Sequence, residues 1–256
     1  MNRLKTKTRS LPLAARSRWT PEVLLGVAEG ERRALGPVLA FDDDGAAIEA
    51  ARLALERTLS LGRAAVAREP PSRPIECARG CSYCCSSKVV ITAPEALRIA
   101  AHLRRTLDPE AFAAVLARVV AVDERTRGLS RARRFEARIA CPLLEGDGSC
   151  SVHEVRPITC AGWTSLDVAA CERHFGAEIE QKSAPVYALG YEIAGAILAG
   201  LSQACTDLGL DGALLELTAA VRIALERPTA GERWRRRLPV FARARDAEST
   251  MPISER

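Results

Sequence analysis

Apolar residues recur at helical spacing along most of the chain. The first sustained pattern begins at the acidic run Asp42–Asp44 and continues to about Arg68, which predicts a helix over that range. The segment Glu69–Pro74 contains three prolines, so it ends this helix and forms a linker. The apolar face of the helix comprises Ile48, Ala51, Leu55, Leu59, Gly62 and Val66.

Two more helices are predicted from their start signals. Thr92 and Glu95 form a capping box ahead of an apolar stripe that continues to Leu107. Asp108, followed by a proline, starts the next helix, and the basic segment Arg125–Arg138 continues it. The capping signals make these the best-defined helix starts in the chain.

The C-terminal part is more apolar. Two helices are expected over about Pro185–Leu208 and Asp211–Arg227, and Thr229 with Glu232 predicts one more capped helix around Trp234. The most apolar stretch falls within the first of these helices. It contains a glutamate and several glycines and falls short of a membrane span, so a buried core helix is expected.

These patterns predict a mainly α fold with little or no β structure, since only Lys88–Ile91 has the composition of a short strand. We expect a basic, irregular segment over residues 1–40, a single helical domain over 41–245 and a tail over 246–256. Within the domain, residues 75–175 form a cysteine-rich, loop-heavy insert. Alanine, leucine and arginine are abundant and aromatic residues make up only 4%, which agrees with a helical fold.

The net charge of +5 is concentrated near the two ends of the chain. Residues 1–20 contain six basic residues and no acidic one, and residues 233–245 contain six arginines and no acid. Such ends can attract nucleic acid or anionic lipid, but no stacking aromatics or nucleic-acid motif accompany them. Solvated basic tails are the preferred interpretation, so nucleic acid is not an expected partner. The sequence identifies no protein partner.

The cysteines change this picture. The chain has nine, and eight of them lie between Cys77 and Cys171. The N-terminal apolar stretch is too short for a signal peptide, so a cytoplasmic location is expected, where disulfides are rare. The clustered cysteines therefore indicate a metal site. Cys205 stands apart inside an apolar helix and is expected to be a core residue.

The first group spans Cys77–Cys85 and places four cysteines within nine residues. Two residues separate Cys81 from Cys84, a gap that lets both thiolates face one metal from a tight turn, as in zinc knuckles and iron–sulfur loops. Gly80 permits the turn before Cys81. Adjacent side chains usually point apart, so Cys84 and Cys85 are expected to serve different roles or different metals.

The second group is spread over loops rich in turn residues. Its gaps of eight, nine and ten residues cannot form a local knuckle, but the loops can return to a site that the first group nucleates. His153 and His174 lie beside this group and are expected to be surface or neighbouring residues, while His102 lies on an ordinary amphipathic helix. The second group comprises Cys141, Cys150, Cys160 and Cys171.

The order of these residues resembles a known family. The first group is followed by Ile91–Glu95 with the sequence ITAPE, then by Cys141-Pro-Leu-Leu and by Gly148–Pro157 with the sequence GSCSVHEVRP, and then by Cys160. This pattern is similar to the CxxCxxCC cysteine-cluster family, the YkgJ-like zinc- or iron-chelating domain. The resemblance spans about Cys77–Cys171, well under half of the chain.

The resemblance implies metal binding in a mostly uncharacterised bacterial family, and a related domain occurs in flagellin lysine N-methylases. It also implies that Arg156 acts beside the metal, where an arginine can offset the charge of thiolates. This chain departs from the pattern in four ways. Three residues separate Cys77 from Cys81, Ser86 follows the double cysteine, His153 replaces a usual tyrosine and Ala161 replaces a common arginine.

The expected cofactor is an iron–sulfur cluster, favoured over zinc because eight cysteines exceed the need of one four-coordinate zinc ion. An N-methyltransferase-type enzyme and a nucleic-acid-binding module remain as alternatives, although no cofactor loop or nucleophile motif supports an enzyme. The predicted metal ligands are Cys77, Cys81, Cys84, Cys85, Cys141, Cys150, Cys160 and Cys171.

Overall fold

The computed structural model describes residues 19–43, 45–175 and 185–249. The fold is mainly α, as predicted, with a single two-stranded antiparallel sheet in the described part of the chain. The helices are α1 (Pro21–Leu39), α2 (Gly45–Arg68), α3 (Ala93–Thr106), α4 (Pro109–Thr126), α5 (Arg131–Ala137), α6 (Ile158–Gly162), α7 (Val168–Phe175), α8 (Ala188–Asp207), α9 (Leu217–Glu226) and α10 (Ala230–Arg235). The strands are β1 (Val90–Ile91) and β2 (Leu215–Glu216), and the 3-10 turns are η1 (Tyr83–Ser86), η2 (His153–Val155) and η3 (Ala242–Ala244).

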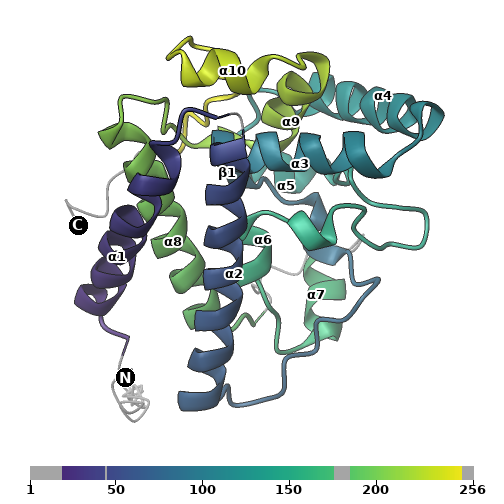
Figure 1. Cartoon of the computed structure of the whole chain (residues 1–256). Coiled ribbons are helices and arrows are strands. Elements are labelled where there is room, and N and C mark those ends of the chain that lie inside the picture. The colour runs from purple at the N-terminus through teal and green to yellow at the C-terminus, as the bar shows by residue number, and fades with distance from the viewer. Residues whose placement is uncertain (1–18, 44, 176–184, 250–256) are drawn as a thin grey trace, which may run out of the picture.

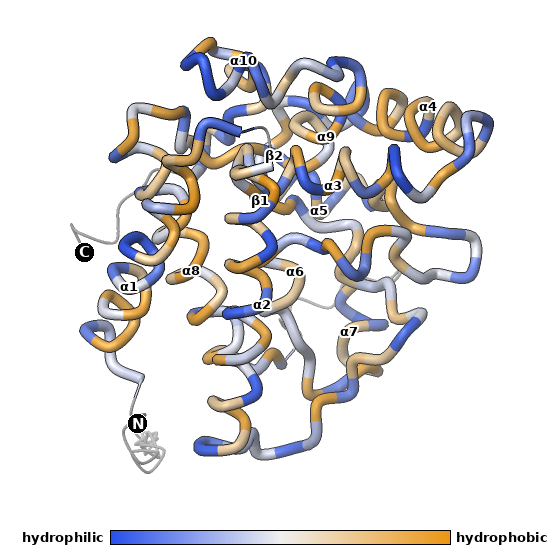
Figure 2. Tube along the Cα trace, in the orientation of Figure 1, coloured by the Kyte–Doolittle hydropathy of each residue, from blue (hydrophilic) through white to orange (hydrophobic). Residues whose placement is uncertain are grey.

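Helix α8 forms the centre of the packing. It contacts α1, α2 and α6, while α3 packs on α2 and α9 (Figure 1). Its length and composition would allow it to cross a membrane, but 67% of that apolar window is buried inside the protein. Hydrophobic and hydrophilic segments follow one another along α2, as expected of an amphipathic helix (Figure 2), and α2 packs against α3 and α8. The prediction of a buried core helix in the most apolar stretch is therefore confirmed by α8.

Helix α1 corrects the prediction of an irregular segment over residues 1–40. Thr20 caps the helix by accepting a hydrogen bond from Val23 N, and the following proline fits the first turn. Leu35 and Leu39 are buried against the core. At Gly200 of α8, a Cβ would lie 2.4 Å from the Ala28 carbonyl, so only glycine allows this close approach. The glycines of α1 and the proline at Pro37 lower its helix propensity, so the sequence did not predict a helix here. Packing against α8 stabilises the helix nevertheless. Residues 1–18 lie outside the described part.

Two other helix boundaries differ from expectation. The helix predicted over Asp211–Arg227 begins only at Leu217, because the preceding two residues pair with β1. Glu216 then caps α9 by accepting a hydrogen bond from Ala219 N at 2.8 Å. The basic segment 125–138 does not continue α4 without a break. Gly128, with φ of +78°, ends that helix and α5 starts anew.

The predicted tail is partly packed. Asp246 N donates to the Leu214 carbonyl, and Lys88 forms ion pairs with both Asp246 and Glu248. Glu248 also accepts a hydrogen bond from Arg131 N at the start of α5. Residues 246–249 therefore belong to the folded domain, which corrects the boundary drawn at 245. Residues 250–256 lie outside the described part.

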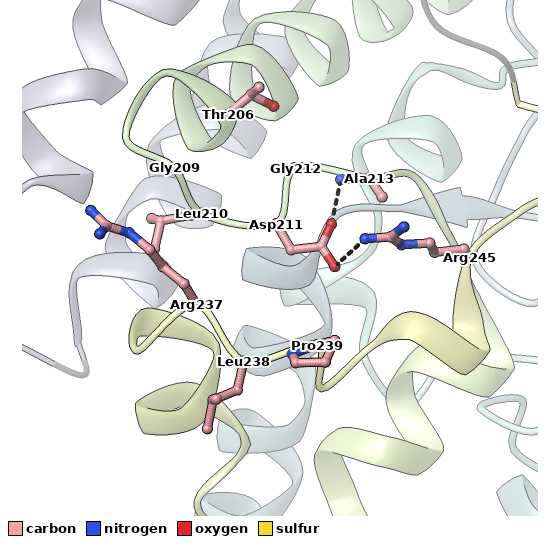
Figure 3. A pocket seen from close by; sticks show the side chains of 10 residues that line it. All are labelled: Thr206, Gly209, Leu210, Asp211, Gly212, Ala213, Arg237, Leu238, Pro239 and Arg245. Carbon is pink, nitrogen blue, oxygen red and sulfur yellow. Dashed lines mark hydrogen bonds and ion pairs between the residues drawn. The ribbon is translucent and has the colours of Figure 1, made fainter.

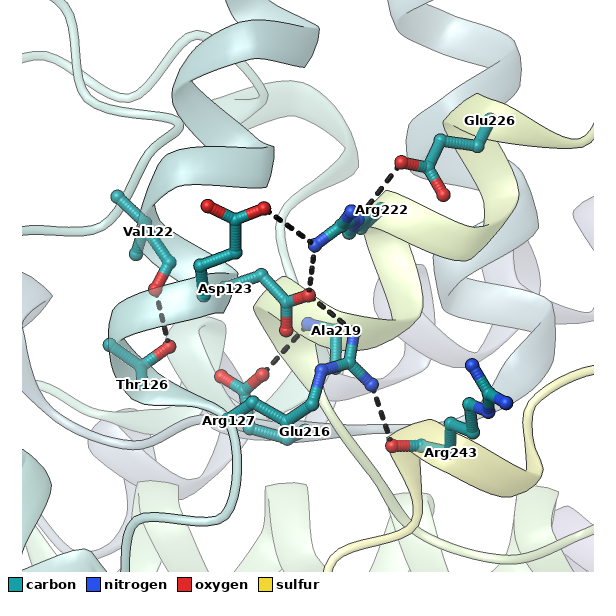
Figure 4. Close-up of polar contacts among 10 residues, drawn as sticks. Val122, Asp123, Thr126, Arg127, Glu216, Ala219, Arg222, Glu226 and Arg243 are labelled. Atoms are coloured by element: carbon teal, nitrogen blue, oxygen red, sulfur yellow. Dashed lines mark hydrogen bonds and ion pairs between the residues drawn. The ribbon is translucent and has the colours of Figure 1, made fainter.

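A buried carboxylate joins α4 to α9. Asp123 of α4 is fully buried and pairs with Arg127 of its own helix and with Arg222 of α9, whose Nη1 lies 3.0 Å from its Oδ2 (Figure 4). Arg127 also donates to the Arg243 carbonyl in η3 at 2.9 Å. The charge of Asp123 is thus shared between two guanidinium groups, as a buried carboxylate requires.

Glu95 connects the helical core to the cysteine region. One oxygen of its buried carboxylate accepts hydrogen bonds from Thr92 N and Thr92 Oγ1 at 2.7 and 2.9 Å, which completes the predicted capping box of α3. The other oxygen accepts a hydrogen bond from Ile158 N at 2.9 Å, at the start of α6. One side chain therefore sets the start of two helices.

We expect Glu95→Ala to destabilise the fold strongly. The substitution leaves Thr92 N and Ile158 N buried without this acceptor, at a cost of about 1–3 kcal/mol for each donor. Urea unfolding should show this loss, and hydrogen exchange should rise around α6. Glu110→Ala, at an exposed glutamate in the first turn of α4, should cost less than about 1 kcal/mol. Equal effects of the two substitutions would contradict the double role of Glu95.

The Lys88–Asp246 pair predicts a pH dependence of stability. Burial alone would raise the pKa of Asp246, but hydrogen bonds from Lys88 and Ser249 hold it below its usual value. The wild type should therefore lose stability as the pH falls through the pKa of Asp246, below the unfolded value of about 3.9. Breaking this buried pair with Lys88→Met should cost about 3–5 kcal/mol at neutral pH.

In Lys88→Met, burial acts on Asp246 without its lysine, so the pKa of Asp246 should rise above the unfolded value. Stability should then increase as the pH falls through that raised pKa, the opposite of the wild type. Urea unfolding at several pH values measures both slopes. Arg133→Met breaks an exposed ion pair with Glu136 and should change stability by less than about 1 kcal/mol. Identical slopes in wild type and Lys88→Met would refute the role of the pair.

Candidate metal centre

The two cysteine groups, distant in sequence, meet in the fold. The first group lies in the segment after α2 and ends in η1, which carries Cys84 and Cys85. The backbone N–H of Cys141 donates to the carbonyl of Cys85 at 2.8 Å. This bond joins the end of the first group directly to the first cysteine of the second.

Two glycines let the loops of the two groups approach each other. Gly80 and Gly148 have φ of +86° and +77°, conformations that favour glycine. A Cβ on Gly148 would lie 2.9 Å from the Gly80 carbonyl, so the turn before Cys150 packs on the turn before Cys81. A bridge between Leu144 and Cys150 closes the second turn as a small hairpin. The turning role predicted for Gly80 fits this arrangement.

Cys160 lies in α6, which Glu95 anchors to the core. Burial raises the pKa of Cys160 well above its usual value, and the neighbouring sulfurs of Cys141, Cys84 and Cys150 raise it further. Burial likewise raises the pKa of Cys141 to about 12, with a further contribution from Cys150. Cys160 therefore lies close enough to Cys84, Cys141 and Cys150 for their charges to interact.

Cys77 and Cys171 lie around Ser165. The backbone N–H of Ser165 donates to the sulfur of Cys77 at 3.1 Å, and the Ser165 side chain forms a hydrogen bond with Cys171. Burial raises the pKa of both cysteines, and the sulfurs of Cys81 and Cys84 raise it further in each case. Helix α7, which carries Cys171, also packs against η1. These contacts place Cys171 beside the first group, although it closes the second in sequence.

Backbone donors approach several sulfurs. The N–H of Leu143 forms a hydrogen bond with Cys141, and that of Val152 does the same with Cys150. In each case the donor lies two residues after the cysteine. Such donors favour the thiolate form, and hydrogen bonds to sulfur are one way in which proteins tune bound clusters.

The donor chemistry fits a thiophilic metal. All nine cysteines are free, and thiolates suit zinc and iron–sulfur clusters. Among the residues that the structure describes, no group of three or more His, Cys, Asp or Glu side chains is already arranged to hold a metal ion. The sulfurs are neighbours rather than converged ligands, so binding requires rotation of cysteine side chains. Ligation by the predicted cysteines stays a prediction.

Arg156 lies beside two of the cysteines. Burial lowers the pKa of Arg156, and the charges of Cys160 and Cys150 oppose that shift. Its Nη1 donates to the His153 carbonyl at 2.9 Å and lies 3.1 Å from Nε2 of the same histidine. The guanidinium is thus positioned by His153 next to the cysteines, and its role toward a metal stays a prediction.

Arg134 is a residue that sequence reasoning missed. Its side chain in α5 is only 3% exposed, and Nε and Nη1 have no hydrogen-bond partner within the described ranges. Burial lowers the pKa of Arg134, while the charges of Glu216 and Cys141 oppose that shift. The sequence showed only a basic segment over residues 125–138, in which nothing distinguishes Arg134 from its exposed neighbours.

The remaining candidates lie apart from the sulfurs or act structurally. The ring of His174 packs on Phe135 and Phe175, with centroids 4.8 and 4.7 Å away. His102 lies on α3, where burial lowers its pKa. Cys205 is fully buried in α8, which agrees with a core position.

A hollow lies elsewhere on the molecule. It is lined by the segment after α8 and by the segment after α10, and no cysteine contributes to it (Figure 3). Across it, Arg245 donates to Asp211 Oδ2 at 3.1 Å. The hollow is open and contains no cysteine, so it is not part of the cysteine site.

Comparison with known proteins supports the cysteine pattern. No curated protein and no solved structure is detectably similar to the chain. One family model matches, over well under half of the 256 residues, and the match begins and ends around the clustered cysteines. Residues 76–178 of this chain match the CxxCxxCC domain, described as a "Putative zinc- or iron-chelating domain", which confirms the resemblance drawn from the cysteines.

Proposed function

We propose that this protein binds an iron–sulfur cluster or zinc through its clustered cysteines, and that an iron–sulfur cluster is the physiological occupant. The observation that carries the proposal is the meeting of two sequence-distant cysteine groups, with Cys141 bonded to Cys85 and with Cys160 close to Cys84. Burial raises the pKa of Cys141 and Cys160 and so favours their protonated thiols, whereas a bound cation or cluster stabilises the thiolate form of sulfurs gathered in this way.

The loops that carry the cysteines also need a metal for their own stability. Only a few of their apolar side chains join the core, among them Leu143 and Val152. Gly80 and Gly148 allow two turns to approach each other closely, and ordering such loops costs conformational entropy. Metal–sulfur bonds would offset that cost.

Two features favour an iron–sulfur cluster over zinc. Eight sulfurs exceed the four that one tetrahedral zinc ion takes. In addition, the guanidinium groups of Arg134 and Arg156 and the N–H donors of Leu143 and Val152 lie near sulfur. Such groups offset cluster charge and tune its potential. The proposal also requires a reducing compartment, the cytoplasm, because oxidised cysteines cannot ligate.

The alternatives gain no support from the described residues. In the arginine-rich C-terminal segment, Arg235 donates to the Phe41 carbonyl, Arg237 to the Leu208 carbonyl, and Arg245 pairs with Asp211. These contacts occupy donors that phosphate binding would need. The open hollow offers no reactive group for an N-methyltransferase-type enzyme, and binding of S-adenosylmethionine would be the test of that activity.

We expect anaerobically purified protein to be brown, to contain iron and acid-labile sulfide, and to bleach on reduction or in air. Cys84→Ser should reduce the metal content and should loosen residues 75–175 more than α8 and α9, measured by hydrogen exchange. Cys205→Ala removes a cysteine outside the cluster and should keep both colour and metal. A colourless protein with stoichiometric zinc and no sulfide, made with iron available, would reject the cluster but not metal binding.

Arg134→Gln should weaken metal retention by about 10–100-fold, the usual effect of removing a group that supports metal ligands. The reason is that its buried charge offsets the thiolate charge near Cys141. Competition with a chelator measures the loss. Arg133→Gln changes an exposed arginine on the same helix and should have no effect on retention. If both variants retain metal as the wild type does, Arg134 has no role at the site.

A further inference from the structure

The last described residues of the chain contact the segments that lead to both cysteine groups. We define the C-terminal strap as residues 242–249, which comprise η3 and the segment after it. The carbonyl of Arg243 accepts a hydrogen bond from Arg127 at the C-cap of α4 (Figure 4), and Arg245 forms a bridge with Leu215 of β2. The strap is therefore anchored to the helical core before it reaches the cysteine region.

Lys88 joins the strap to the first cysteine group. It follows Cys85 by three residues, and its side chain is only 7% exposed. Its Nζ pairs with Asp246, whose side chain is fully buried, and donates to Glu248 Oε2 at 2.9 Å. The strap thus fixes the position of the chain directly after Cys85.

The same oxygen of Glu248 joins the strap to the second cysteine group. Oε2 also accepts a hydrogen bond from Arg131 N at 2.6 Å, in the first turn of α5. An N–H in the first turn has no acceptor within its own helix, so a carboxylate is favourable there. Helix α5 ends at Ala137, four residues before Cys141. One carboxylate oxygen therefore contacts both segments that lead to the gathered cysteines.

These contacts close a ring together with the bond between the two cysteine groups. At one end of the ring, Cys141 N donates to the Cys85 carbonyl. At the other end, Glu248 holds Lys88 and Arg131. The segments between the two ends are short, and one of them is mostly the helix α5. A change in the separation of the two cysteines is therefore transmitted to Glu248.

The carboxylate of Glu248 is ionised at neutral pH, because hydrogen bonds from Lys88 and from Arg131 N lower its pKa below the usual value. Its side chain is 40% exposed, whereas those of Lys88 and Asp246 are buried. Substitution of Glu248 removes the link between the two segments and leaves the buried Lys88–Asp246 pair in place. The effect of the link can therefore be measured separately from that of the pair.

We propose that Glu248 is a positioning residue for metal binding, which holds the segments of Cys85 and Cys141 in the arrangement that gathers their sulfurs. This inference rests on the proposed metal-binding function and adds a residue more than 70 positions beyond the last clustered cysteine. Because coupling between two sites is reciprocal, a metal that binds more tightly with the strap in place also stabilises the strap by the same factor. Metal affinity and protection of residues 246–249 are therefore two separate readouts.

Metal affinity of full-length variants gives the first readout. The probe is zinc(II), added to the reduced, metal-free protein in competition with a chromophoric chelator. For protein purified with iron, the rate at which a chelator removes that iron takes its place. Glu248→Ala loses both hydrogen bonds and should bind zinc(II) at least about fivefold more weakly than the wild type. Glu248→Gln keeps an acceptor for Arg131 N without the charge, so its affinity should lie between the two.

Glu226→Ala is the matched control. The side chain of Glu226 is also 40% exposed, and it pairs with Arg222 within the single helix α9. Its removal breaks a comparable ion pair that joins no two segments, so the affinity for zinc(II) should equal that of the wild type. Far-ultraviolet circular dichroism checks that each variant keeps its helical content.

Hydrogen exchange gives the second readout, and in the wild type it needs no substitution. Asp246 N donates to the Leu214 carbonyl, so exchange at residues 246–249 reports whether the strap is in place. Metal loading should slow this exchange in the wild type and in Glu226→Ala, and should slow it much less in Glu248→Gln. If Glu248→Ala does not fold, Glu248→Gln and the wild-type exchange decide the question.

Equal zinc affinity of the wild type and the Glu248 variants would overturn this inference and leave metal binding intact. The same holds if metal loading leaves exchange at residues 246–249 unchanged in the wild type. Equal weakening in Glu226→Ala would reduce Glu248 to a contribution to stability and would also overturn the inference. A wild type that binds neither zinc nor iron would overturn the proposed function together with this inference.

Discussion

The buried carboxylate of Glu95 is the interaction on which the rest of the structure depends. It accepts hydrogen bonds from the start of α3 and from the start of α6, so the helical core and the cysteine region share one fixed point. Burial raises the pKa of Glu95, and the three N–H and O–H donors around it offset part of the cost of keeping the charge. Without this link, α6 would have to hold Cys160 in place with five residues and no side-chain cap.

The cysteine region is held together by individual hydrogen bonds and close backbone approaches, whereas the helical part is held together by a hydrophobic core. The Cys141–Cys85 bond, the Gly80–Gly148 approach and Ser165 each join segments that are distant in sequence. None of these contacts buries much apolar surface. The helical part is organised in the opposite way, since α8 gains its stability from packing against α1, α2 and α6. The two parts of the molecule therefore depend on different forces.

Local signals in the sequence predicted the features that arise from local physics. The capping box at Thr92, the helix start at Asp108 and the mainly α class needed only neighbouring residues. Features that depend on distant partners were missed. Helix α1 needs α8, and the late start of α9 at Leu217 needs β1.

At the site, the cysteine spacing indicated metal binding and the resemblance to the CxxCxxCC domain, but not the neighbours of each sulfur. The grouping of Cys171 with Cys77 depends on Ser165, which carries no sequence signal of its own. The inward orientation of Arg134 depends on how α5 lies against Glu216 and Cys141. These contacts join residues that are distant in sequence, so a local sequence pattern could not predict them.

The packing of Lys88 has a consequence for biosynthesis. Its partner Glu248 lies 160 residues later in the chain, while the first cysteine group ends just before Lys88. Because a chain folds progressively as it leaves the ribosome, the cysteine loops emerge long before residues 246–249 exist. The segment next to the cysteines thus stays without its ionic partners until residues 246–249 have been synthesised. During that interval the cysteine loops are joined to the helical core without the ion pairs of Lys88, and those pairs form only after residues 246–249 have emerged.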